Sequence, residues 1–94
     1  MRICIDPDEG AALDALCVAV KEDFEARKDE DSLAMARITA SIRRGVPAGG
    51  GVLELEGLEL ALLKAFIRGY LYPSGKEDGP CYAALRECAG KLGL

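Results

Sequence analysis

The chain has 94 residues, half of them hydrophobic, and a formal net charge of −4 at pH 7. This length suits a single domain with a modest core. The acidic balance disfavours non-specific binding to nucleic acid or to an anionic membrane. The start of the chain lacks the apolar segment of a signal peptide, and no uninterrupted apolar run of about 20 residues could span a bilayer. We therefore expect a cytosolic protein, in a bacterial or phage context.

The N-terminal third predicts a strand followed by a helix. Ile3–Ile5 is a short apolar strand candidate. Asp6, Pro7 and Glu9 then form a helix-start pattern, with Asp6 as the N-cap, Pro7 in the first helical position and Glu9 reaching back from the third. The helix should run to about Arg27. Its apolar stripe comprises Leu13, Leu16, Cys17, Val20 and Phe24.

A second helix is predicted from Ser32 to Arg44, with Asp31 as its cap. Gly45 is placed to end this helix in the left-handed conformation that glycine adopts readily. Residues 46–51 include three consecutive glycines and form a linker. The core face of this helix comprises Met35, Ile38 and Ile42.

The most apolar stretch of the chain comes after the linker. Val52–Leu55 alternates apolar and polar residues, which predicts a half-buried strand. From Leu58 to Leu71 the apolar positions recur at helical spacing and cover about half of the helix circumference. A helix this apolar is expected at the centre of the fold. Its remaining side carries small residues where another backbone could approach closely: Ala61, Ala65 and Gly69.

A last helix is predicted after a loop at Tyr72–Gly79. Pro80 suits its first position, and the helix should cover roughly Cys81–Leu92. Its inward positions are Leu85, Cys88 and Leu92, assisted by Tyr82 and Ala84.

The two halves of the chain resemble each other. A shift of 50 positions places Ile3 on Leu53 and keeps the apolar positions of later helices in phase without a gap. The pattern predicts a mostly α, compact four-helix domain over residues 1–94, built from a tandem β-α-α repeat with half-repeats 1–45 and 52–94. A short antiparallel pair of strands would join the halves, with the helices on one side. The alternative is four amphipathic helices in coincidental phase.

The absence of four residue types restricts the chemistry of this chain. It contains no His, Asn, Gln or Trp. Without histidine, the Ser-His and Cys-His nucleophile pairs cannot be built, and the common histidine zinc sites are excluded. No phosphate-binding glycine pattern is present. We therefore expect no enzymatic activity, no cofactor and no metal site.

The four cysteines lack the spacing of a metal knuckle. Cys17 and Cys88 fall at core positions of their helices and are expected to act as small hydrophobic residues. Cys4 and Cys81 should be more exposed. Cys81, near a helix N-terminus, is the better candidate for a reactive thiol, followed by Cys4. A Cys₄ metal site is the alternative.

A basic face on the second predicted helix is the candidate for nucleic-acid binding. Arg37 and Arg44 share one side of the helix with Arg43 nearby, an arrangement that could contact phosphates. The half of the chain that carries them is nevertheless acidic in balance. A solvated polar face is the alternative.

Some apolar residues do not fit a single inward stripe on each helix. Because exposed apolar patches usually mark a partner, we predict a non-enzymatic protein–protein interaction module or regulator, with a protein partner and a homodimeric state. A nucleic-acid-associated regulator and, last, a thiol-dependent enzyme are the alternatives. The residues assigned to the partner surface are Val18, Leu33, Leu58 and Tyr72.

Overall fold

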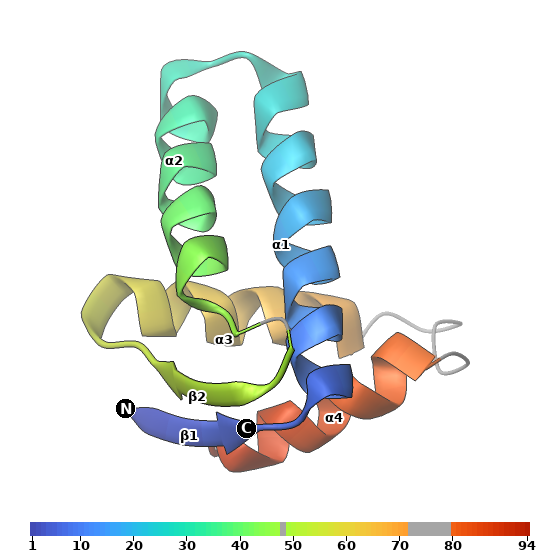
Figure 1. Ribbon diagram of the computed structural model, residues 1–94. Helices are drawn as coiled ribbons and strands as arrows, with labels where there is room; N and C mark the ends of the chain where they lie inside the picture. The colour runs from blue at the N-terminus through green and yellow to red at the C-terminus, as the bar shows by residue number, and fades with distance from the viewer. Residues whose placement is uncertain (48, 72–79) are drawn as a thin grey trace.

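The computed structural model describes residues 1–47, 49–71 and 80–94, the last range without the side chains of Pro80 and Cys81. The described chain is mostly helical, with four helices and a two-stranded antiparallel sheet, so the predicted fold class is confirmed (Figure 1). No helix within those ranges combines the length and the apolar character needed to cross a membrane. The elements are β1 (Arg2–Ile5), α1 (Pro7–Arg27), α2 (Glu30–Gly45), β2 (Gly51–Glu54), α3 (Gly57–Leu71) and α4 (Pro80–Lys91).

The sheet joins the two halves of the chain as predicted. β1 pairs with β2 antiparallel, in a register that places Arg2 opposite Glu54. The pairing continues beyond the strands, because the Met1 ammonium donates to the Leu55 carbonyl at 2.7 Å. The first residues of the chain are thereby fixed against the segment that leads into α3.

The sheet has one buried face and one exposed face, because successive side chains of a strand point to opposite sides. Ile5 and Leu53 are buried on the core side. Cys4 and Val52, which lie opposite each other in the pairing, are exposed. The sheet therefore closes one end of the core and presents its other face to solvent.

α1 begins with the capping box that the sequence predicts. The Glu9 N–H donates to Asp6 Oδ1 at 2.7 Å, and the Asp6 N–H donates to Glu9 Oε1 at 3.0 Å. Two of the N–H groups left without a helical partner are thereby satisfied. The helix ends at Arg27, and its C-cap, Lys28, has a left-handed φ of 59°.

The predicted ends of α2 need correction. Its cap is Asp29, not Asp31, because the Asp29 carboxylate accepts from the Ser32 N–H at 2.7 Å and from the Ser32 hydroxyl at 3.0 Å. Gly45 is the last helical residue and is not left-handed; the chain leaves the helix through Val46, with φ of −83°. The proline after Val46 favours such an extended exit.

The core lies where the foot of the α1–α2 hairpin meets the sheet, α3 and α4 (Figure 1). α1 and α2 run side by side, and α3 crosses behind their lower end. The β-α-α order occurs twice, but equivalence of the halves beyond that order stays a prediction. Cys17 and Cys88 are fully buried, as predicted. The largest buried apolar side chains are Leu13, Ile42, Leu53, Leu63, Ile67 and Leu85.

Gly50 holds the linker against the start of α1. Its φ is +87°, and a Cβ there would lie 2.9 Å from the Pro7 nitrogen. We expect Gly50→Ala to lower the free energy of unfolding by about 1–3 kcal/mol, because both the backbone conformation and the contact become strained. Urea unfolding measures this. Gly49→Ala is the matched control, since a Cβ at Gly49 meets nothing within 4 Å; equal stability of both variants would contradict the expectation.

Candidate functional site

α3 is a surface helix with one uncovered apolar side, rather than the central helix expected from its sequence. Only Leu63 and Ile67 are buried among its 15 residues. α1, which is longer and has six buried residues, occupies the middle of the fold. Leu58 is 62% exposed, and Leu62 is half-buried at the edge of the same side. We call this side the α3 face; it consists of Leu58, Ala61, Leu62, Ala65 and Gly69.

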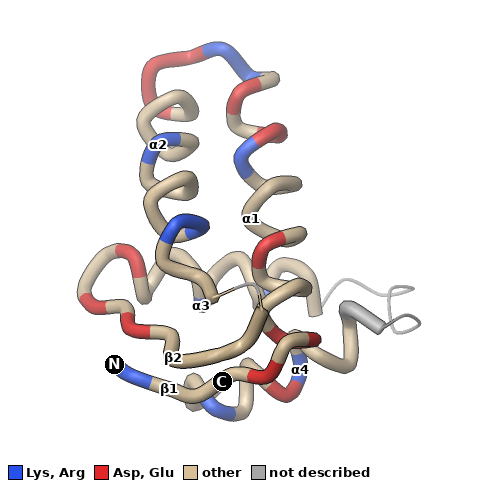
Figure 2. The backbone as a smooth tube through the Cα atoms, viewed as in Figure 1, with Lys and Arg blue, Asp and Glu red and all other residues tan. Residues whose placement is uncertain are grey.

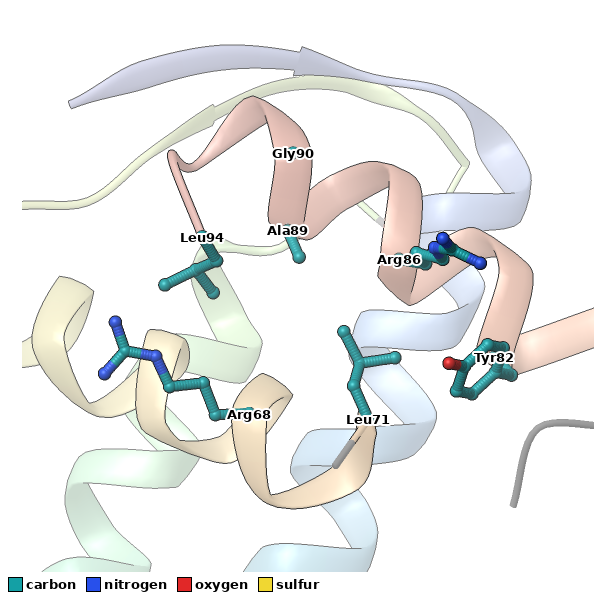
Figure 3. A pocket seen from close by; sticks show the side chains of 7 residues that line it. All are labelled: Arg68, Leu71, Tyr82, Arg86, Ala89, Gly90 and Leu94. Atoms are coloured by element: carbon teal, nitrogen blue, oxygen red, sulfur yellow. The ribbon is translucent and has the colours of Figure 1, made fainter. Parts of the chain in front are cut away.

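A groove between α3 and α4 lies beside the α3 face (Figure 3). Arg68 and Leu94 lie at one end of the groove, and Arg86 and Tyr82 at the other. Neither arginine has an ion-pair partner within the described part of the chain. The volume is about 760 Å³, and the described lining contains no acidic residue: Arg68, Leu71, Tyr82, Arg86, Ala89, Gly90 and Leu94.

A cluster of carboxylates lies at the start of α1. One oxygen from each of Asp6, Glu9 and Glu87 lies within 4.8 Å of the others. Glu9 is fully buried, and its Oε1 accepts from the Asp6 N–H and from the Lys91 ammonium. Lys91 also donates to the Cys4 carbonyl at 3.0 Å. Glu9 Oε2 is buried without a hydrogen-bond partner in the described structure, which is energetically costly for a carboxylate oxygen.

The sequence pattern identifies Glu9 as a capping residue but not as a buried charge. Its local pattern is that of an ordinary helix start, and capping acids are usually solvated. The contact that sets its environment joins it to Lys91, 82 positions away. No spacing rule connects residues so distant in the chain. The only sequence signal for the burial of Glu9 is its position just before an apolar stripe.

The residues predicted for the partner surface lie in different places. Val18 is half-buried in α1, and Leu33 is 41% exposed in the first turn of α2. The first turn of α2 lies at the far end of the hairpin from α3, where Leu58 is exposed (Figure 1). Tyr72 lies outside the described residues. Of the predicted set, Leu58 alone belongs to the α3 face.

The arginines proposed for nucleic-acid binding do not form a purely basic face. Arg43 Nε donates to Asp14 Oδ1 at 2.8 Å, and this bond raises the pKa of the guanidinium. Arg37 and Arg44 are exposed on the same helix. Because Asp14 places a negative charge beside Arg43, the local field that would attract phosphate is weakened. Nucleic-acid binding stays a prediction.

The buried thiols are poor nucleophiles at neutral pH. Burial raises the pKa of Cys17 and of Cys88 to about 11 each. Since the thiolate is the reactive form, neither thiol is activated. Cys4 is exposed on β1, and the side chain of Cys81 lies outside the described part. Thiol chemistry at neutral pH would have to use one of these two residues.

Comparison with known proteins adds no relative, since no protein family, curated protein or solved structure matches the chain. Inferences about function therefore depend on the geometry of the α3 face, the groove and the carboxylate cluster.

The ion pair of Lys91 with Glu9 predicts a loss of stability at alkaline pH. The hydrogen bond to Glu9 raises the pKa of Lys91 above its ordinary value of 10.5. A raised folded-state pKa contributes stability that is fully present below the unfolded pKa and is lost as the pH rises through the folded one. We expect urea unfolding to show a larger loss of stability above about pH 10 for the natural chain than for Glu9→Gln.

Glu9→Gln is a matched probe because glutamine preserves the shape and the capping role while removing the charge. The thiols of Cys17 and Cys88, whose pKa values are raised to about 11 chiefly by burial, also lower the stability at alkaline pH in both proteins. Because the charge of Glu9 also contributes to the raised pKa of Cys88, the comparison is between the slopes of stability against pH of two proteins that both carry Cys88→Ala. Equal slopes in the two proteins would contradict the ion-pair origin.

Proposed function

We propose that the chain is a small cytosolic, non-enzymatic protein–protein interaction module that pairs with a second copy of itself through the α3 face. The observation that carries the proposal is the uncovered apolar side of α3, where Leu58 is 62% exposed. Leu58 is contiguous along the helix with the exposed Ala61 and Ala65 and the half-buried Leu62, and contiguous exposed apolar surface is typical of a binding site. A second copy is favoured over other partners because the surface is self-complementary in shape and in charge.

The shape of the α3 face favours an antiparallel pair. Its two large residues, Leu58 and Leu62, lie in the first half of the helix with Ala61, and the second half of the face contains only small residues, Ala65 and Gly69. A Cβ at Gly69 would meet nothing within 4 Å. Antiparallel packing about a twofold axis sets each leucine opposite a small residue of the other copy. A parallel pair would set leucine against leucine and leave voids at the small positions. Such voids lose van der Waals contacts and weaken the pair.

The charges favour the same orientation. Acidic residues gather around the start of α3 (Figure 2), where Glu54 and Glu56 are exposed. Arg68 lies near the other end of the helix, and Arg86 lies on α4 at the opposite end of the groove from Arg68. An antiparallel pair brings the acidic start of one copy to the basic groove of the other, twice by symmetry. The helix macrodipoles also oppose each other in this arrangement.

Ala65→Arg tests the contact at the centre of the α3 face. A bulky charge there would meet the other copy, so we expect the dimer dissociation constant to rise at least about tenfold. Sedimentation equilibrium measures it. Ala19→Arg is the control, because Ala19 is an equally small, exposed residue on α1. A natural chain that stays monomeric at about 1 mM, the weak end of measurable affinity, would overturn the proposal.

Charge reversal tests the antiparallel orientation. We expect Arg68→Glu and Glu56→Arg each to weaken dimerisation by roughly three- to tenfold, because each removes an attraction and adds a repulsion. Combined in one chain, the two changes recreate opposite charges across the interface and should restore most of the affinity. Losses that simply add in the double variant, measured by the same sedimentation method, would contradict this orientation.

A further inference from the structure

We propose that Asp6, Glu9 and Glu87 form a binding site for one hard divalent cation of the Mg²⁺, Ca²⁺ or Mn²⁺ class. The three carboxylates come from two segments that are distant in sequence: the start of α1 and the middle of α4. One oxygen of each lies within 4.8 Å of the others. Oxygens that share an ion at about 2.0–2.6 Å sit roughly 3–5 Å apart. The cluster therefore has the spacing of three ligands around one ion.

The buried oxygen of Glu9 is the independent observation that points to a ligand. Glu9 is fully buried, and the hydrogen bonds it accepts from Asp6 and Lys91 both go to Oε1. Oε2 has no hydrogen-bond partner within the described structure. A buried carboxylate oxygen is almost always paired or bound to metal. A cation held by Asp6, Glu87 and the Glu9 carboxylate would compensate the charge of this buried group.

The charge of the site requires more compensation than the protein supplies. Lys91 offsets one of the three carboxylates, and the N-terminus of α1 contributes roughly half a positive charge. More than one negative charge is left among oxygens held close together. A bound divalent ion relieves this repulsion. The gain exceeds the unfavourable interaction of the ion with the positive end of the α1 dipole.

The surroundings select a hydrated ion with oxygen ligands. A cavity of about 500 Å³ opens beside the cluster and leaves room for the waters that Mg²⁺ and Ca²⁺ retain. The three ligands are all carboxylates, and the chain contains no histidine. Zinc, which prefers thiolate and imidazole, is disfavoured. The cavity is lined by Asp6, Asp8, Ala11, Ala12, Ala83, Ala84 and Glu87.

Titration of the full chain with Mn²⁺, followed by electron paramagnetic resonance of the free ion, tests the site. We expect one Mn²⁺ per chain, displaced by excess Ca²⁺ or Mg²⁺. Glu87→Gln and Glu9→Gln should each weaken Mn²⁺ binding at least tenfold. Glu22→Gln, an exposed acid elsewhere on α1, should leave it unchanged.

The test uses both Glu87→Gln and Glu9→Gln because the second substitution changes a buried residue. Glu87 is exposed, so its glutamine variant folds even if Glu9→Gln lowers stability. Failure of the natural chain to retain Mn²⁺ at millimolar concentration, or unchanged binding by Glu87→Gln, would overturn the site. The same titration on Ala65→Arg makes the result independent of dimerisation.

Discussion

The buried carboxylate of Glu9 is the constraint on which the arrangement of this fold depends. It caps α1 through the Asp6 N–H and binds the ammonium of Lys91 from the last turn of α4. Lys91 in turn reaches the Cys4 carbonyl of β1. A charge removed from water must keep its partners, because breaking a buried pair leaves it uncompensated. The start of α1, the strand β1 and the end of α4 are thereby held at one point.

The contact between Glu9 and Lys91 determines which apolar surfaces are buried within a single copy of the chain. With α4 held against α1, Leu85 and Cys88 are buried in the same core as the apolar stripe of α1. α3 then packs from one side, through Leu63 and Ile67, and retains an exposed opposite side. The open groove between α3 and α4 follows from the same geometry, since α4 is drawn toward α1 rather than fully against α3.

Local signals in the sequence were sufficient for the elements and much of the core. The capping box of Asp6 and Glu9 depends on neighbours within a few residues, and the structure confirms it. The choice of Asp29 over Asp31 as the cap of α2 depends on whether Ser32 can donate to it, which a propensity scale does not resolve. The sites depend on contacts between distant segments. Neither the burial of Glu9 nor the exposed side of α3 follows from periodicity, which gives an apolar arc but not the number of helices that cover it.

α4 connects the two proposed sites. Arg86 and Glu87 are adjacent in sequence, and about 100° of helix rotation separates their directions. Arg86 lines the groove toward α3, whereas Glu87 joins Asp6 and Glu9 on the side of α1. An ion in the proposed cation site would lie on the α1 side of α4, where the Lys91–Glu9 pair already holds the helix. Because the two sites use different sides of the same helix, a substitution at Glu87 leaves the described lining of the groove unchanged, and one at Arg86 leaves the three carboxylates in place.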